Sequence, residues 1–501
     1  RPALVVVITV DQLRPDYLVR YRSQLQGGLA RLLERGAVFE HAHQDHAITE
    51  TAVGHATLLA GRHPARHGII RNDAGVQDST SPLVNATIGG ASPFRFRGTG
   101  LMDWLKVRDL RSRGLSVSLK DRGAILPLGR AREQAYWYGG TGEMITSTYY
   151  AEAWPGWVRA FNARGLSAQA REWDLLLAPE AYAEPDSAPW EVPGRSPVFP
   201  HRLAAGADAR RLLIATPFGD EYLLAFALEG VQRLDLGRGP APDLLAVSLS
   251  ATDVIGHAFG PDSREIHDQV LRLDRALGTF LDSLYRLRDS TRILVALTAD
   301  HGVTSIPERT VAVGHGPAER VSFDAFAYRM DSALVARLGP APAGRRWVEI
   351  DNGLVLLERR ALAARGVSPD SLASAWVREV RAHRAVLRVD TRRTIAAADT
   401  ARDAIARRWR HLLPPEIEIA ALITLRPGSV WAATIPAMHG SPHDPDAAVP
   451  LLLMGPGVRA GRYPARVGVV DLAPTLARLL DVPPLERLDG RVLTEALQPT
   501  R

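Results

Sequence analysis

The chain has 501 residues, of which 46% are hydrophobic and 23% charged, and this composition excludes a disordered or fibrous protein. The formal net charge of +6 is small for this length, and no basic run interleaved with aromatic residues indicates nucleic-acid binding. Cysteine is absent, which excludes disulfide scaffolds, thiolate metal sites and cysteine nucleophiles. No apolar run approaches the roughly 20 residues that a membrane-spanning helix needs, so we expect no membrane span.

Strand-like and helix-like segments alternate along the chain. Continuous aliphatic runs predict buried strands at residues 4–10, 244–249, 293–297 and 449–454. Such runs are typical of strands that helices cover on both faces, as in parallel sheets. Helical periodicity predicts helices at residues 270–287 and 370–387. The alternation predicts an α/β fold with a central, mostly parallel sheet flanked by helices.

Two stretches depart from this alternation. Residues 125–235 are rich in Trp, Tyr, Pro and Gly, and residues 305–430 contain Ala- and Arg-rich helices with a short strand at 353–357. We expect one catalytic domain over residues 1–501, with cap insertions at about 125–235 and 305–430. A basic helix is expected at 394–413, and we interpret it as solvated rather than membrane-bound because its apolar face is mostly alanine.

Aspartate and histidine side chains accompany each predicted strand. They are Asp11 after the first strand, Asp253 and His257 after the second, Asp300 and His301 after the third, and His439 and Asp444 just ahead of the last. Ligands of open α/β sheets bind at the carboxyl ends of the strands. One Asp–His pair is a weak signal, because Asp often caps a helix. Four sets at one edge of a sheet together predict a metal site.

The spacing within these sets favours zinc. Asp253 and His257 are four residues apart and would face the same way on one helical turn. A carboxylate and an imidazole so placed can share one ion, and mixed oxygen and nitrogen ligands suit zinc. Asp300 and His301 could supply ligands to a second ion.

Two further segments could act on a phosphoryl group. Residues 49–57 carry hydroxyls near an expected helix start, where the backbone N–H groups and the positive end of the helix dipole lie, although a threonine there is more often a simple cap. Lys120 and Arg122 are two residues apart, so in an extended segment both would point to one side. Without the metal residues, this pair would be only a surface feature.

Several motifs carry a family resemblance over nearly the full length. They are residues 5–13 (Val-Val-Val-Ile-Thr-Val-Asp-Gln-Leu), 118–125 (Ser-Leu-Lys-Asp-Arg-Gly-Ala-Ile), 471–477 (Asp-Leu-Ala-Pro-Thr-Leu-Ala) and 488–491 (Leu-Asp-Gly-Arg). The chain resembles the alkaline phosphatase superfamily, and within it the monomeric threonine-nucleophile alkaline phosphatases of the phosphate-irrepressible type, which are related to nucleotide pyrophosphatase/phosphodiesterases. The segment 118–125 looks like the signature of the phosphomonoesterase subgroup, and phosphodiesterase relatives are not expected to carry its Lys/Arg pair.

The resemblance implies an alkaline-phosphatase-like fold and two Zn²⁺ ions. The implied ligands of one zinc are Asp253, His257 and His439. The implied ligands of the other are Asp11, Thr51, Asp300 and His301, with Thr51 also the nucleophile. The implied contacts to phosphoryl oxygens come from Asn72, Lys120 and Arg122.

The implied activity is hydrolysis of small-molecule phosphate monoesters through a phosphothreonine on Thr51, with retention at phosphorus. Inorganic phosphate is expected as product and competitive inhibitor, and the protein is expected to be a monomer. We expect a periplasmic or secreted bacterial protein, because the chain begins directly at a strand as if a leader had been removed, although no leader is visible.

Alternatives remain open at this point. The same two-zinc core could belong to a phosphodiesterase or nucleotide pyrophosphatase, or more remotely to a non-catalytic binder of phosphorylated ligands or metal. His443 could replace His439 as a ligand. The segment 41–46, with three histidines, could hold a third metal, but hydrogen bonding and packing beside the threonine loop is the favoured interpretation. The family often has Gly-Pro-Gly after the threonine, where this chain has Ala52, Val53 and Gly54.

Overall fold

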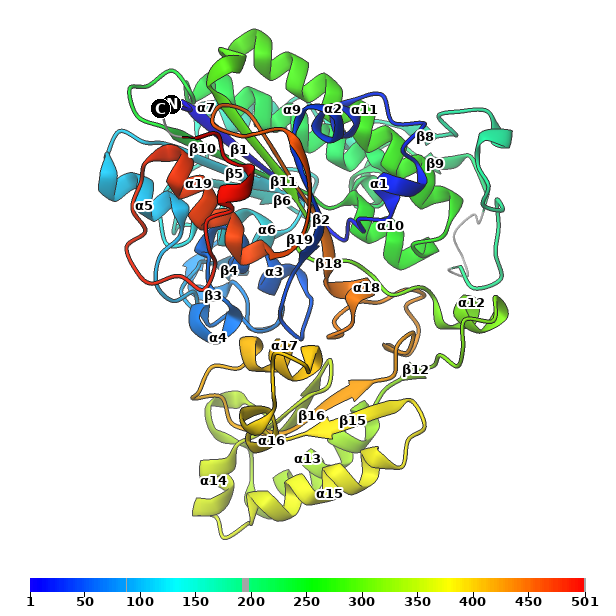
Figure 1. Ribbon diagram of the computed structural model, residues 1–501. Helices are drawn as coiled ribbons and strands as arrows, with labels where there is room; N and C mark the ends of the chain where they lie inside the picture. The colour runs from blue at the N-terminus through cyan, green and yellow to red at the C-terminus, as the bar shows by residue number, and fades with distance from the viewer. Residues whose placement is uncertain (87, 192–197, 500–501) are drawn as a thin grey trace.

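The computed structural model describes residues 1–86, 88–191 and 198–499 (Figure 1). Its centre is a nine-stranded sheet. The strands are β1 (Leu4–Val10), β2 (Ala37–His43), β5 (Gly114–Ser118), β6 (Gln134–Tyr138), β7 (Met144–Ile145), β10 (Asp243–Leu249), β11 (Ile293–Thr298), β18 (Ala448–Met454) and β19 (Gly461–Gly468). Their order in the sheet is β19-β2-β18-β11-β1-β10-β5-β6-β7.

The centre of this sheet is parallel, as the sequence predicts. Strands β11, β1, β10, β5 and β6 are parallel neighbours, and β19 is parallel to β2. Strand β7 runs antiparallel to β6, and β18 runs antiparallel to both β11 and β2. The start of β18 therefore lies at the same edge as the ends of β1, β10 and β11. The predicted α/β class with a mostly parallel sheet is confirmed.

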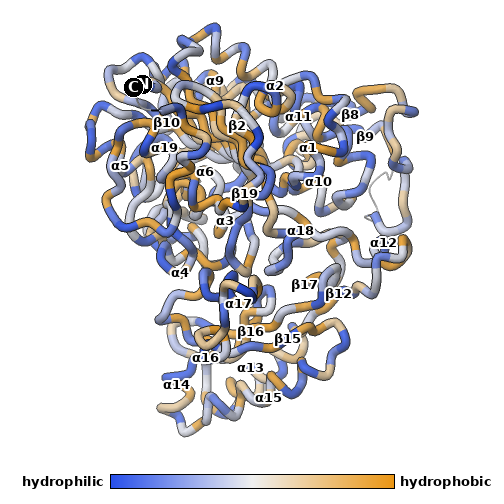
Figure 2. Tube along the Cα trace, in the orientation of Figure 1, coloured by the Kyte–Doolittle hydropathy of each residue, from blue (hydrophilic) through white to orange (hydrophobic). Residues whose placement is uncertain are grey.

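Helices cover both faces of the sheet, which explains why its central strands are aliphatic throughout. Every residue of β1, β10 and β11 is buried. Helices α2 (Gly28–Arg35), α9 (Pro217–Arg233) and α11 (Arg264–Leu287) pack together, and α3 (Thr51–Ala60), α6 (Asp121–Ile125) and α19 (Leu472–Leu480) form a second group (Figure 1). The hydrophobic strands run between these layers of helices (Figure 2). Burying each such aliphatic side chain contributes about 1.5–3 kcal/mol.

A smaller unit, the cap, lies apart from the main sheet and is built around a four-stranded sheet (Figure 1). Its strands are β13 (Val348–Asp351), β14 (Leu354–Leu357), β15 (Val386–Asp390) and β16 (Ile419–Leu425), in the order β13-β14-β16-β15. Its helices are α13 (Asp324–Leu338), α14 (Arg359–Ala364), α15 (Pro369–Arg381), α16 (Arg392–Ala397) and α17 (Ala404–Leu412). Buried Trp347 and Trp376 belong to a core of its own.

Shorter elements connect these units. The helices are α1 (Tyr17–Arg20), α4 (Pro64–His67), α5 (Leu101–Arg108), α7 (Gly156–Asn162), α8 (Ala207–Leu212), α10 (Ala251–Phe259), α12 (Pro307–Ala312) and α18 (Asp444–Ala447). The strands are β3 (Gln77–Pro82), β4 (Gly90–Ala91), β8 (Arg171–Trp173), β9 (His201–Leu203), β12 (Arg320–Val321) and β17 (Val430–Trp431). Within the described residues, no helix combines the length and apolar character needed to cross a bilayer.

The predicted helices have different bounds in the structure, and the one expected at 270–287 begins already at Arg264. The helix expected at 370–387 ends at Arg381, because residues 386–390 pair with β16 as strand β15. The helix expected at 394–413 is two helices, since Thr391 caps α16 and Asp403 caps α17. Residues 134–145, within the first expected insertion, contribute β6 and β7 to the central sheet. The division into one catalytic domain with two cap insertions stays a prediction.

Candidate active site

The carboxyl edge of the central sheet brings the predicted metal-ligand candidates together. Two overlapping groups have ligand atoms within 4.8 Å of one another: Asp253, His301 and His439, and Asp11, Asp300 and His301. Nε2 of His301 lies 3.4 Å from Oδ1 of Asp11 and 3.6 Å from Oδ2 of Asp300. Because the two groups share His301, two ions bound there would be neighbours.

His257 and His439 face the same carboxylate. Nε2 of His257 lies 3.3 Å from Oδ1 of Asp253, and Nε2 of His439 lies 3.6 Å from that oxygen. The two Nε2 atoms are 3.2 Å apart. The spacing of four residues between Asp253 and His257 on helix α10 therefore places both on one face, as expected.

Each of the three imidazoles is oriented by a backbone carbonyl. Nδ1 of His257 donates to the carbonyl of Ala437 at 2.7 Å, and Nδ1 of His439 donates to that of Thr49 at 2.7 Å. Nδ1 of His301 donates to the carbonyl of Gly302 at 2.9 Å. A proton held on Nδ1 leaves the lone pair of Nε2 facing the carboxylates, which is the tautomer that binds metal. Burial lowers the pKa of His301 and of His439 to about 4, so both stay neutral, as metal ligands must be.

The charge balance of this group fits divalent cations. Asp11, Asp253 and Asp300 are all buried, and burial and the two neighbouring carboxylates raise the pKa of Asp11 to about 6. Oδ1 of Asp11, Oδ2 of Asp300 and Nε2 of His301 are buried without a hydrogen-bond partner among the described residues. Unpaired buried acceptors aimed at one another are costly unless a cation binds them. Their mixed oxygen and nitrogen donors suit zinc.

His443 points away from this group. Its Nε2 donates to the carbonyl of Leu425 in the cap strand β16 at 2.8 Å. The geometry therefore favours His439 over His443 as a ligand candidate.

Thr51 is the first residue of helix α3 and is buried. A Cβ on Gly54, one turn along, would lie only 2.1 Å from the carbonyl oxygen of Asp300, so the helix approaches this loop as only glycine allows. Nδ1 of His55 lies 2.8 Å from the carbonyl oxygen of Thr51 and 3.1 Å from Oδ2 of Asp300. Its Nε2 pairs with the hydroxyl of Ser248 at 2.8 Å. The start of α3 is thereby fixed to the Asp300 loop.

Asn72 is held so that its amide group can donate. Its Oδ1 accepts a hydrogen bond from the backbone N–H of Ala52 at 2.9 Å. Since a backbone N–H can only donate, the amide NH₂ of Asn72 is the free end. Its backbone N–H donates to Oε2 of Glu50 at 2.6 Å. The Asn72 loop is therefore tied on both sides of Thr51.

Lys120 and Arg122 are not in one extended segment as expected. Lys120 is extended, but Arg122 lies in the first turn of α6, because the helix begins at Asp121. Nζ of Lys120 bridges Oδ2 of Asp11 and Oδ2 of Asp253 at 2.6 Å each. Burial opposes the charge of Lys120, but these carboxylates raise its pKa above the ordinary value. Nε of Arg122 is buried with no hydrogen-bond partner in the described part of the chain and is available as a donor.

Sequence reasoning missed Gln12, which links the two ligand groups. Its backbone N–H donates to Oδ1 of Asp300 at 3.2 Å, and its side-chain amide donates to Oδ1 of Asp253 at 2.8 Å. Its φ of 66° is in the left-handed region, unusual outside glycine. A glutamine after an aspartate carries no distinctive pattern, so only the fold reveals this role.

The segment 41–46 forms ion pairs and hydrogen bonds. Asp45 accepts from Arg407, Arg408 and Arg466, and His43 contacts Arg466. Nδ1 of His46 donates to the carbonyl of Ile48 at 2.9 Å. No third cluster of candidate ligands is found here within residues 1–86, 88–191 and 198–499. These contacts agree with the packing interpretation.

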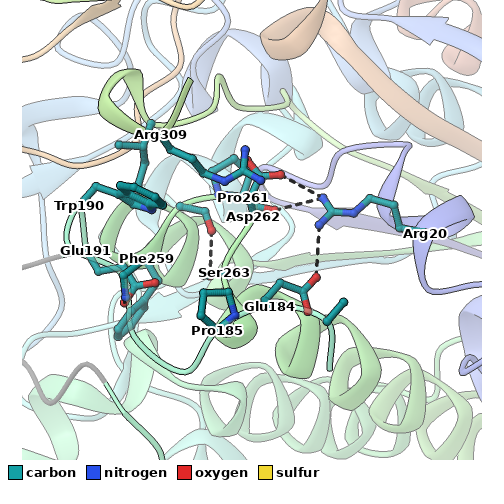
Figure 3. Close-up of a pocket in the computed structure, with 14 residues that line it drawn as sticks. Arg20, Glu184, Pro185, Trp190, Glu191, Phe259, Pro261, Asp262, Ser263 and Arg309 are labelled. Carbon is teal, nitrogen blue, oxygen red and sulfur yellow. Dashed lines mark hydrogen bonds and ion pairs between the residues drawn. The ribbon is translucent and has the colours of Figure 1, made fainter. Parts of the chain in front are cut away.

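A separate cavity of about 270 Å³ lies beyond the end of α10 (Figure 3). Arg20 is 3.4 Å from both Asp262 and Glu184, and Arg309 is 3.1 Å from Asp262. These four charged side chains are thus paired with one another. None of the predicted site residues lines it.

Comparisons with known proteins bear directly on this site. Residues 5–337 match the family model for type I phosphodiesterase / nucleotide pyrophosphatase. The alkaline phosphatase PafA of Elizabethkingia meningoseptica is 31% identical over 536 residues, covering 99% of this chain and 95% of PafA. The crystal structure of wild-type PafA has a TM-score of 0.90 at 30% identity over 99% of both chains. A PafA variant altered at a threonine, an asparagine, a lysine and an arginine, in that chain order, has a TM-score of 0.89 at 28% identity over 99% of both chains.

The fold and the site define an alkaline-phosphatase-like α/β enzyme. The chain belongs to the type I phosphodiesterase / nucleotide pyrophosphatase family, and its similarity to PafA groups it with the alkaline phosphatases, which are phosphomonoester hydrolases. The resemblance expected from the sequence motifs is confirmed.

Proposed function

We propose that this protein is a zinc-dependent alkaline phosphatase that hydrolyses phosphate monoesters through a phosphothreonine on Thr51. The observation that carries the proposal is the group of unpaired buried atoms on Asp11, Asp300 and His301, packed against the helix that begins at Thr51. The PafA variant supports it, because this chain carries the same four residue types in the same order. Here they are Thr51, Asn72, Lys120 and Arg122.

Two zinc ions fit the available donors. One would be held by Asp253, His257 and His439, and the other by Asp11, Thr51, Asp300 and His301. When bound, such ions lower the pKa of a coordinated hydroxyl and stabilise the negative charge on the attacking and leaving oxygens of an in-line displacement.

The residues of the chain act in two displacements. The hydroxyl oxygen of Thr51 attacks phosphorus, the bond from phosphorus to the alcohol breaks, and a phosphothreonine forms. Water then attacks the phosphothreonine, and inorganic phosphate leaves Thr51. The free amide of Asn72 and the guanidinium of Arg122 donate to the non-bridging oxygens, and Lys120 supplies positive charge beside them. Two in-line displacements retain configuration at phosphorus.

A phosphodiesterase or nucleotide pyrophosphatase activity is the second candidate, because the family model that matches residues 5–337 carries that description. Lys120 and Arg122 favour the monoesterase, since a monoester has one more charged oxygen for these cations to hold. A non-catalytic binder of phosphorylated ligands or metal is the third candidate, and it predicts phosphate or metal binding without turnover.

The deciding experiment is steady-state hydrolysis of an aryl phosphate monoester and the matching diester, before chelation, after chelation and after zinc is restored. We expect chelator-sensitive monoesterase activity that Thr51→Ala abolishes, with phosphate trapped on a peptide containing Thr51 after acid quenching of the active enzyme. A preference for the diester would transfer the protein to the second candidate. Metal binding without turnover of either ester would favour the binder.

The remaining properties follow from the same proposal. The product, inorganic phosphate, presents the same non-bridging oxygens as the substrate and should inhibit competitively. We propose a monomer acting on small-molecule phosphate esters in the periplasm or outside a bacterial cell, without nucleic-acid binding. Sedimentation and cell fractionation would test the state of assembly and the location.

A further inference from the structure

The carboxylate of Glu50 links the two segments that would act on phosphorus. Glu50 directly precedes Thr51 and is buried. Its Oε2 accepts the backbone N–H of Asn72 at 2.6 Å, and its Oε1 accepts the side-chain amide of Asn352 from the cap. One carboxylate therefore joins the nucleophile, the phosphoryl-binding loop and the cap. The proposed reaction assigns no role to Glu50 or to Asn352.

Asn352 lies in the turn between β13 and β14, at a φ of 43°. Its side chain also reaches the loop of His439: a Cβ on Gly440 would lie 2.9–3.0 Å from the amide atoms of Asn352. The backbone N–H of Gly440 donates to the hydroxyl of Thr49 at 3.2 Å. The cap turn is thus inserted between the nucleophile loop and the loop that carries a metal-ligand candidate.

A second contact ties the same part of the cap to Asn72. Arg71 makes a two-pronged ion pair with Glu349 of β13, at 2.5 and 3.3 Å. Asp351, beside Asn352, lies 3.7 Å from the same guanidinium. The segment 71–72 is therefore held by the cap strand on one side and by Glu50 on the other.

We propose that Asn352 is a positioning residue, which acts through Glu50 to fix the start of α3 and the amide of Asn72 relative to each other. The proposal rests on the roles given above to Thr51 and Asn72. Loss of the Asn352 amide would leave Oε1 of Glu50 unpaired in a buried site. The carboxylate would then be free to turn away from the backbone of Asn72, and the reacting geometry would loosen.

Hydrogen exchange tests the link without requiring turnover. In Asn352→Ala, the amide hydrogens of Asn72 and Ala52 should exchange about tenfold faster, as expected for the loss of one to two hydrogen bonds in their support. Asn85→Ala is the matched control, because Asn85 is also an asparagine at positive φ, is exposed and has no side-chain hydrogen bond in the described residues. Unchanged exchange at Asn72 and Ala52 in a folded Asn352→Ala protein would overturn the proposal.

Kinetics on an aryl phosphate monoester distinguish positioning from general destabilisation. Asn352→Ala should lower kcat/KM by about tenfold, but by less than about twofold when Asn72 is already alanine, because residues that act through one another are not additive. Glu50→Gln keeps groups that can hydrogen-bond to Asn72 and Asn352 and should retain more activity than Glu50→Ala. Full additivity of Asn352→Ala and Asn72→Ala would also overturn the proposal.

Hydrogen exchange and kinetics together distinguish failure of the proposed function from failure of the positioning role of Asn352. If the wild-type protein does not hydrolyse the monoester, the proposed function fails, and the exchange measurement alone decides whether the cap turn positions these loops. If the monoester is hydrolysed but neither exchange nor the double-mutant cycle responds, only the role of Asn352 fails.

Discussion

Gly54→Ala tests how closely the helix of Thr51 must approach the Asp300 loop. The new Cβ would lie 2.1 Å from the carbonyl oxygen of Asp300, against 3.4 Å for an ordinary contact. Helix and loop must therefore separate by about 1.3 Å. Elsewhere in a helix the same substitution would stabilise by about 1 kcal/mol, whereas overpacking costs about 1–3 kcal/mol. The net loss of stability is therefore at most about 2 kcal/mol.

Activity should respond far more than stability. A misplacement of about 1 Å between reacting groups can cost about 100-fold in rate, so kcat/KM for an aryl phosphate monoester should fall by about this factor. Tm should fall by no more than a few degrees. Because Asp300 also carries an unpaired oxygen of the ligand group, zinc retained after dialysis should decrease in the same variant.

Gly156→Ala is the control, since a Cβ at the start of α7 meets its nearest atom at 3.9 Å. It should leave kcat/KM and zinc content unchanged. Wild-type kcat/KM in Gly54→Ala would refute the argument that contact between α3 and the Asp300 loop places the nucleophile.

Three further predictions concern the ligand group and the cap. Lys120→Ala should bind zinc more tightly in equilibrium dialysis, because the carboxylates of Asp11 and Asp253 lose the ammonium that competes for their oxygens. The same variant should lose the preference for a monoester over a diester. Weaker zinc binding would contradict this prediction. His439→Ala should retain less zinc after dialysis, whereas His443→Ala should retain the normal amount, because of these two imidazoles only that of His439 faces the ligand group. Asp45→Asn should lower the free energy of unfolding by about 3 kcal/mol, as expected when one partner of a largely buried ion-pair network is removed. Burial raises the pKa of Asp45, but hydrogen bonds from the cationic side chains around it hold that pKa well below its ordinary value. The folded state therefore favours the charged form of Asp45. The loss of unfolding free energy in Asp45→Asn should be complete above pH of about 4 and become smaller as the pH falls further. Urea unfolding of both proteins at pH 7 and pH 3.5 checks this, and an equal loss at both pH values would contradict it.

Local sequence was enough to predict the edge at which the site forms. The aliphatic runs of β1, β10 and β11 identify buried parallel strands, and the polar residues that follow them must meet because parallel strands end at one edge. Asp11, Asp253 and Asp300 could therefore be grouped without any coordinates. The family motif then supplied Thr51 and Asn72, which lie in loops whose position no strand pattern predicts.

Other features depend on contacts that local sequence does not encode. An aliphatic run has the same pattern in either direction, so only the pairing of β18 with β11 and β2 reveals that it is antiparallel. The end of α15 at Arg381 is decided by the pairing of the next residues with β16. The link from Glu50 to Asn352 spans 302 positions and involves residue types that are common in ordinary turns. Ala52 and Val53 depart from the expected motif, but Gly54 keeps its glycine, and the lack of a Cβ there is what the close approach to Asp300 requires.

The metal-ligand candidates and the nucleophile are held by different parts of the molecule, so loss of zinc and loss of activity should be separable. The metal-ligand candidates lie at the edge of the central sheet, where the hydrogen bonds of Gln12 and the backbone carbonyls behind each imidazole fix them. The start of α3 and the Asn72 loop are fixed in part from the cap, through Asn352 and Arg71. A substitution in the cap turn should therefore lower kcat/KM at normal zinc content, whereas removal of a metal-ligand candidate at the sheet edge should lower both. If cap variants lost zinc in proportion to activity, the cap would be supporting the metal site itself, and the division between holding the ions and aiming the nucleophile would be wrong.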